Sequence, residues 1–107
     1  MQTVESKLVT AGDNRNKAVL ELTVNNHPGV MSHICGLFSR RVYNMEGILC
    51  MPIDDGRLSR VWIRVTGNGQ LEQIAKQLRK LEDVQTVRYH EAEHEVFVQL
   101  EDYFRVS

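Results

Sequence analysis

The sequence contains little cysteine, little proline and no long hydrophobic run. Two cysteines and two prolines occur among 107 residues. Two cysteines are too few for the disulfide framework of a small secreted domain, so we expect Cys35 and Cys50 to be reduced and buried. The longest hydrophobic stretch, 47–53, is far shorter than the ~20 residues that span a bilayer. These absences predict a chain without a membrane segment, and we expect it in the cytoplasm.

The sequence also lacks an excess of charge of either sign. It has 13 Lys and Arg against 14 Asp and Glu, a net charge of −1, and no long run of one sign. An electrostatic attraction to nucleic acid or to an anionic membrane is therefore not indicated. Nucleotide-binding and hydrolase patterns (G-x-x-x-x-G-K-[ST], G-x-G-x-x-G, G-x-S-x-G) and C-x-x-C pairs do not occur.

Hydrophobic periodicity divides the chain into three parts. Residues 1–16 are polar without a period and are expected to form a flexible leader, 17–90 to form one domain, and 91–107 to form a C-terminal extension. Alternating apolar residues predict strands, and apolar residues at helical spacing predict two amphipathic helices. The expected strands are 18–24, 48–53, 58–66 and 84–89, and the expected helices are 28 to about 44 and 71–81.

The resulting order, β-α-β-β-α-β, predicts an α+β fold of the ferredoxin-like type, with one antiparallel sheet and both helices on a single face. Trp62 alternates away from the helix side and is expected on the open face. The segment 48–53 is apolar on both faces, which suggests a strand covered twice. The stretch 96–100 could add one further strand to the sheet, although the sequence leaves a helix open there.

The segment Asn26-His27-Pro28-Gly29-Val30 joins the first strand to the first helix. A helix N-terminus presents unpaired amides to an anion, and Gly29 lets a ligand approach the backbone. Asn26 offers both a donor and an acceptor, so the turn could hold the carboxylate and ammonium of an amino acid. The alternative is an ordinary helix that Asn26 caps and Pro28 initiates. Asn44 is likewise either a helix C-cap or a ligand contact for a neighbouring copy.

Residues 90–94 match the H-E-x-x-H pattern of zinc proteases. That chemistry needs both histidines on one face of a stable helix, with a third ligand. Here the pattern lies between strand-like segments without a helical apolar stripe. We interpret it as a polar connection.

Several segments together resemble a known family. They are LELTV at 20–24, the NHPGV turn, CGLFSRR at 35–41, NMEGILC at 44–50, LEQI at 71–74 and KLEDV at 80–84. They resemble the ACT domain of the small regulatory subunit of acetolactate synthase (acetohydroxyacid synthase), in its short single-ACT form. The resemblance covers about 18–89.

The resemblance implies a non-catalytic regulatory subunit with no cofactor in this chain. A separate large subunit would carry thiamine diphosphate, Mg²⁺ and FAD, and this chain would activate it and confer feedback inhibition by valine. Two copies would pair as a homodimer with valine between them. The implied effector contacts are Asn26, Gly29, Val30 and Met31 of one copy, with Asn44 and Ile48 of the other.

Two other functions share the predicted fold. One is a free-standing ACT amino-acid sensor without a catalytic partner. The other is an RRM-like nucleic-acid-binding module, which needs paired aromatic residues on its central strands, where this sequence has Trp62 alone.

Overall fold

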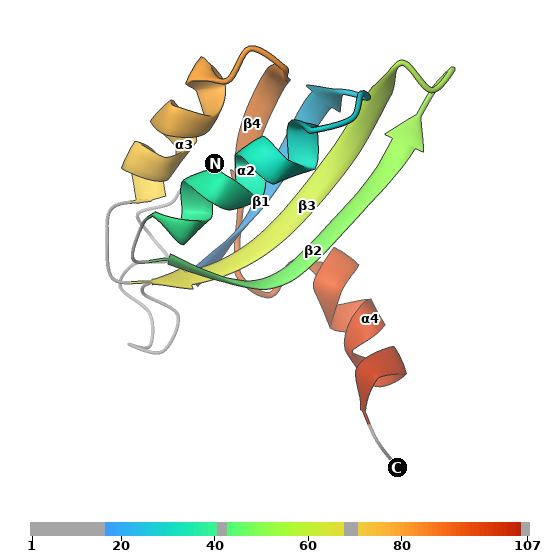
Figure 1. Cartoon of the computed structure of the whole chain (residues 1–107). Helices are drawn as coiled ribbons and strands as arrows, with labels where there is room; N and C mark the ends of the chain where they lie inside the picture. Colours follow the sequence, from blue (N-terminus) through green and yellow to red (C-terminus); the bar gives the residue numbers. More distant parts are fainter. Residues whose placement is uncertain (1–16, 41–42, 68–70, 106–107) are drawn as a thin grey trace.

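An antiparallel sheet of four strands is found in the computed structural model, which describes residues 17–40, 43–67 and 71–105. The sheet order is β2-β3-β1-β4, and α2 and α3 lie together on one face (Figure 1). The predicted ferredoxin-like order is confirmed, and the predicted leader, 1–16, lies outside the described residues. The elements are β1 (Lys17–Asn25), α2 (Val30–Ser39), β2 (Tyr43–Ile53), β3 (Leu58–Gly67), α3 (Leu71–Lys80), β4 (Val84–His90) and α4 (Glu95–Phe104).

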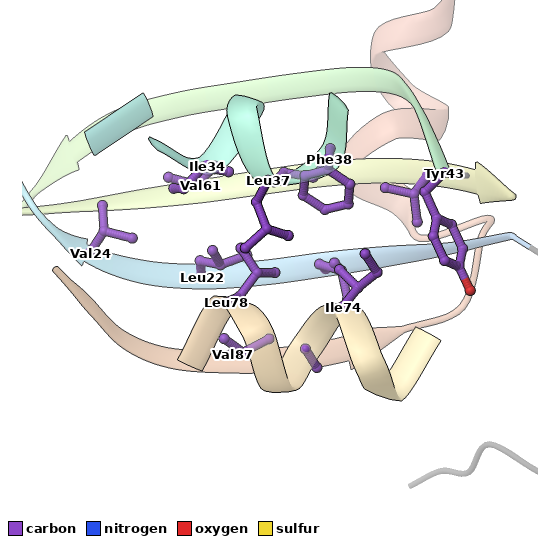
Figure 2. Packing of buried hydrophobic residues seen from close by; sticks show 14 of the residues in the cluster. Leu22, Val24, Ile34, Leu37, Phe38, Tyr43, Val61, Ile74, Leu78 and Val87 are labelled. Carbon is purple, nitrogen blue, oxygen red and sulfur yellow. The ribbon is translucent and has the colours of Figure 1, made fainter. Parts of the chain in front are cut away.

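The hydrophobic core lies between the two central strands and the two helices (Figure 2). Alternate residues of β1 and β3 point toward α2 and α3, as the sequence pattern predicts. Each helix contributes the apolar stripe expected from its spacing. The largest fully buried members are Leu20, Leu22, Val24, Val61, Ile63 and Val65 from the strands, with Ile34, Phe38, Ile74 and Leu78 from the helices.

Helix α2 is shorter at both ends than the sequence predicts. It begins at Val30 with Gly29 as N-cap, so Pro28 precedes the helix and does not lie in its first turn. It ends at Ser39 and not near residue 44. The C-terminal end is closed by the Arg40 amide, which donates to the Leu37 carbonyl. Tyr43 is buried as the first residue of β2.

Strand β2 lies at the edge of the sheet, with β3 as its hydrogen-bonded neighbour. The prediction of a strand covered on both faces is therefore wrong for a single copy. Ile48 is 39% exposed and Met51 is 68% exposed. Cys50 is exposed and Cys35 half-buried, so the expected burial of both thiols is also wrong.

The C-terminal segment forms a helix, α4, and not the further strand suggested for 96–100. The His94 ring accepts a 3.0 Å hydrogen bond from the Val96 amide and caps the helix. Phe97 is buried against Gly47 of β2, with the Arg64 guanidinium 5.4 Å from the ring centre. Because Arg64 alternates away from the core, α4 starts on the sheet face opposite α2 and α3. From there it extends beyond the sheet (Figure 1).

Within the described ranges, no helix is both long enough and apolar enough to cross a bilayer.

Candidate functional site

The turn between β1 and α2 leaves the start of the helix open. Gly29 has φ 95° and ψ −17°, and a Cβ built there would meet nothing within 4 Å. No side chain among the described residues caps α2, and its first turn holds no acidic residue. The first amides of a helix lack intrahelical partners and carry partial positive charge. This end of α2 can therefore accept an anion at the protein surface.

Asn26 ties this turn to the β2–β3 hairpin. Its backbone amide donates to the Arg57 carbonyl at 2.9 Å, and its side-chain Nδ2 donates to the Gly56 carbonyl at 2.8 Å. The alternative in which Asn26 caps α2 is therefore wrong. Asn26 is exposed, and a concavity of about 700 Å³ opens beside it, bordered by the hairpin.

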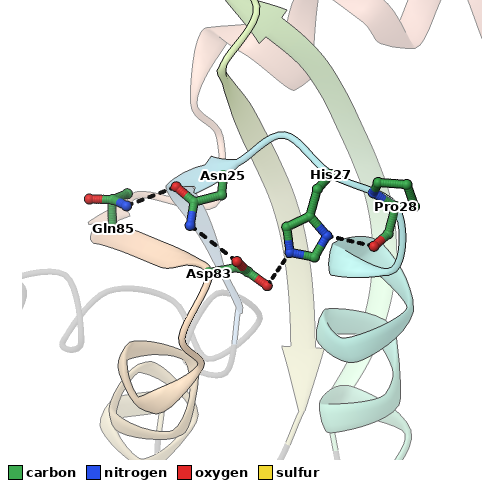
Figure 3. Close-up of polar contacts among 5 residues, drawn as sticks. All are labelled: Asn25, His27, Pro28, Asp83 and Gln85. Carbon is green, nitrogen blue, oxygen red and sulfur yellow. Dashed lines mark hydrogen bonds and ion pairs between the residues drawn. The ribbon is translucent and has the colours of Figure 1, made fainter.

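A polar network fixes the turn from the other side (Figure 3). His27 Nε2 lies 2.6 Å from Oδ2 of Asp83. The other carboxylate oxygen, Oδ1, accepts a hydrogen bond from Asn25 Nδ2 at 3.1 Å. Gln85 donates to Asn25 Oδ1 at 2.9 Å. The bond from Asn25, and then the one from His27, hold the pKa of Asp83 below its usual range. No local pattern in the sequence indicates this network, because its side-chain bonds join residues 56 to 60 positions apart.

The side chains of Val30 and Met31 pack with the hydrophobic core. Val30 is 4% exposed within the core, and Met31 packs against the core from its edge. What they present to the open end of α2 is their backbone, at the first two helical positions. Of the four residues predicted at this end of the site, Asn26 and Gly29 are the exposed ones.

Asn44 and Ile48 lie on β2, away from the turn in the same copy. Asn25 pairs with Leu58 of β3, whereas Asn44 pairs with Thr66, eight residues further along that strand. At 3.3 Å per residue this separation is about 26 Å. Asn44 belongs to a strand, so its alternative role as a helix C-cap is wrong. A single copy does not bring the six predicted site residues together.

The two histidines of the H-E-x-x-H pattern do not share a helix. His90 ends β4 and His94 precedes α4, with their ring centres 4.6 Å apart. Trp62 lies against both rings on the sheet face opposite α2 and α3. No group of three His, Cys, Asp or Glu residues suited to a metal ion occurs within 17–40, 43–67 and 71–105. The segment 91–94 connects two elements, as predicted.

Most of the chain is similar to one family of known proteins. Residues 20–86 match a family described as "AHAS small subunit-like ACT domain". The chain is 47% identical over 96 residues to the acetolactate synthase isozyme 1 small subunit of Escherichia coli K12, covering 90% of this chain and 97% of that protein. It is 44% identical over 80 residues to the acetolactate synthase small subunit of Haemophilus influenzae, covering 73% of this chain and 49% of that protein.

Solved structures show the same similarity. The acetolactate synthase small subunit from Thermotoga maritima superposes with a TM-score of 0.62 and 28% identity, over 83% of this chain and 68% of that chain. The ACT domain of GTP pyrophosphokinase from Chlorobium tepidum has a TM-score of 0.59 over 69% of this chain and 96% of that chain. At 21% identity it shares the fold alone.

Proposed function

Because the chain belongs to the family of AHAS small subunit-like ACT domains, we propose that it is a non-catalytic regulatory subunit of an acetolactate synthase. In this proposal it activates a separate large subunit and makes that subunit sensitive to valine. The large subunit supplies the catalytic site, with thiamine diphosphate, Mg²⁺ and FAD. The observation that carries the proposal is the match to a small subunit along 97% of that relative's length.

The proposed effector site begins at the open end of α2. The valine carboxylate accepts hydrogen bonds from the backbone amides of Gly29 and Met31, and from that of Val30 in place of its long 3.4 Å bond to the His27 carbonyl. Asn26 binds a polar end of the effector from the side. Support comes from the uncapped helix start, which holds no acidic residue, and from the absence of a Cβ at Gly29. A zwitterion suits such a place because its anionic end meets the partial positive charge of the helix.

A second copy completes the site in this proposal. β2 is an edge strand with unpaired backbone groups and exposed apolar side chains, which favours pairing with another strand. If two β2 strands pair antiparallel about a two-fold axis near Ile48, Asn44 of one copy lies near the Ile53 end of the other. That end adjoins the Asn26 turn through the hairpin. A homodimer thus brings together the residues that one copy keeps apart.

Feedback inhibition follows if the effector bridges the two copies. Its binding free energy then favours one relative arrangement of the two copies, and with it one arrangement of the surface that faces the large subunit. Valine inhibits only if it binds the inactive arrangement more tightly than the active one. Coupling energies of about 1–3 kcal/mol are typical of allosteric proteins and would suffice.

Reconstitution tests the proposed function directly. Adding the purified chain to a large subunit of acetolactate synthase is expected to increase acetolactate formation, and valine is expected to reverse the increase. The rate is measured with the large subunit alone, with the chain, and with the chain plus valine. A chain that neither binds the large subunit nor changes its rate, while still binding valine, would favour the free-standing sensor instead.

The β2 edge provides a second prediction. Ile48→Lys places like charges face to face across the two-fold axis, where such contacts cost several kcal/mol. We expect the dissociation constant of the dimer to rise at least roughly tenfold, and valine affinity to fall with it. Analytical ultracentrifugation and calorimetry measure the two effects.

Val98→Lys is the matched control for this substitution. Val98 is similarly exposed, at 45% against 39% for Ile48, but lies on α4. The control is expected to stay dimeric and to bind valine normally. If Ile48→Lys stayed dimeric with full valine affinity, pairing through β2 would be wrong.

A further inference from the structure

His27 lies in the β1–α2 turn, two residues before Gly29, and both of its ring nitrogens face acceptors (Figure 3). Nδ1 is 2.6 Å from the Pro28 carbonyl oxygen, and Nε2 is 2.6 Å from a carboxylate oxygen of Asp83. A carbonyl oxygen and an ionised carboxylate can only accept, so the ring must donate from both nitrogens. The geometry is that of an imidazolium cation.

Asp83 faces the ring as an ionised carboxylate. The side chain of Asn25 donates to it at 3.1 Å, and this bond, ahead of the one from His27, holds the pKa of Asp83 below its ordinary value. The Pro28 carbonyl, and after it Asp83, raise the pKa of His27 above its ordinary value. The cation is therefore present at low pH and is lost as the pH rises through this raised pKa.

The bond to Pro28 bears on the proposed effector site. The Pro28–Gly29 peptide is trans and planar, so its carbonyl and its N–H point in opposite directions. Holding the carbonyl toward the His27 ring therefore turns the Gly29 amide away from it. Glycine at φ 95° resists rotation of this plane only weakly. Orientation of the Gly29 amide consequently depends on the bond from His27.

We propose that the His27 imidazolium is a positioning residue that aims the Gly29 amide at the effector carboxylate, so that proton binding at His27 and effector binding strengthen each other. The inference rests on the proposed function of this turn. Because linkage is reciprocal, bound valine must hold the proton on His27 as strongly as the proton favours valine. As the pH rises the ring loses its Nδ1 proton, and the remaining proton stays on Nε2 against the carboxylate of Asp83. The bond to the Pro28 carbonyl is then lost, and valine affinity falls.

Other charged groups around the turn do not reproduce this effect. The charge of Glu82 raises the pKa of His27 less than Asp83 does, and the charge of His33 on α2 lowers the pKa of Asp83 without a hydrogen bond to it. On the hairpin side, Asp55 and Arg57 are paired with each other at 2.7 Å. The remaining charged residues that border the two concavities beside the turn are Lys80 and Asp54.

Calorimetry of the full chain with valine tests the coupling. Between about pH 6 and about pH 8.5, on either side of the usual histidine range, wild-type affinity is expected to fall roughly tenfold. Near the midpoint, binding should take up a proton, seen as a heat that depends on the buffer. His27→Gln cannot titrate, so its valine affinity should be independent of pH. His33→Gln changes an exposed histidine on the neighbouring helix α2 and should keep the wild-type profile.

A measurement without ligand separates this inference from the proposed function. In an NMR pH titration, the Gly29 amide signal should move with the same midpoint as the His27 ring. In Asp83→Asn both midpoints should shift to lower pH, since the carboxylate that favours the cation is gone.

Valine binding with the same affinity at every pH, or a Gly29 amide that ignores His27, would overturn the positioning role alone. Absence of valine binding at every pH would contradict the proposed function as well.

Discussion

Replacing Gly29 with aspartate is expected to abolish measurable valine binding and, with it, valine inhibition of the reconstituted synthase. Gly29 has φ 95°, where an L side chain is strained by about 1–3 kcal/mol. The new carboxylate would also lie where the effector carboxylate is proposed to bind. Two like unit charges about 4 Å apart repel by about 4 kcal/mol at an effective dielectric constant of about 20. We therefore expect calorimetry to show at least a roughly hundredfold loss of affinity.

Two variants separate the charge from the backbone strain. Gly29→Ala adds strain without charge and is expected to bind valine more weakly than wild type but more tightly than Gly29→Asp. Gly36→Asp adds the same charge further along α2, with open space around it and no positive φ, and is expected to retain binding. Thermal unfolding checks that each variant is folded. Wild-type affinity in a folded Gly29→Asp variant would place the effector elsewhere.

The fold could be predicted from the sequence because its central elements carry regular patterns. Leu20, Leu22 and Val24 alternate strictly, and one face of β1 is buried as that alternation predicts. Helix α3 has its apolar stripe and its exposed charges at the predicted positions. Such periods reflect burial of a single face, which local sequence records directly.

Element boundaries and the last helix were less predictable, because they depend on contacts between distant segments. The sequence predicts Tyr43 near the end of a helix, but it is buried as the first residue of β2. The run 96–100 is rich in β-branched and aromatic residues, which favour a strand. The decisive contacts there are tertiary: Phe97 fills the space above Gly47, and the His94 ring caps the helix. Neither contact leaves a local signal.

The turn of the candidate site could be predicted from the sequence, whereas the residues that hold it in place could not. The N-H-P-G-V turn identifies the open helix start, because glycine and proline there have direct conformational consequences. The exposed edge position of β2 depends on sheet order, which no single segment encodes. The His27–Asp83 pair joins residues 56 positions apart, so only the folded chain reveals it.

Replacing Phe38 with alanine is expected to have the largest effect on stability. Phe38 is 2% exposed and is among the largest fully buried side chains of the described residues. Truncating a buried phenylalanine to alanine costs about 3–5 kcal/mol, through lost apolar burial and the cavity left behind. Small domains are stable by only about 5–15 kcal/mol, so this is a large share. In a domain of this size each kcal/mol lowers Tm by roughly 4–8 °C.

Phe104→Ala is the control with the same chemical change. Its ring is 79% exposed on α4, and exposed substitutions change stability by about 0.5 kcal/mol or less. Both variants should be unfolded by denaturant at one protein concentration, since dimerisation adds to apparent stability. A Phe38→Ala variant as stable as wild type would contradict the core between α2 and the sheet. A costly Phe104→Ala would mean that the end of α4 is covered in solution, since an open ring has no burial to lose.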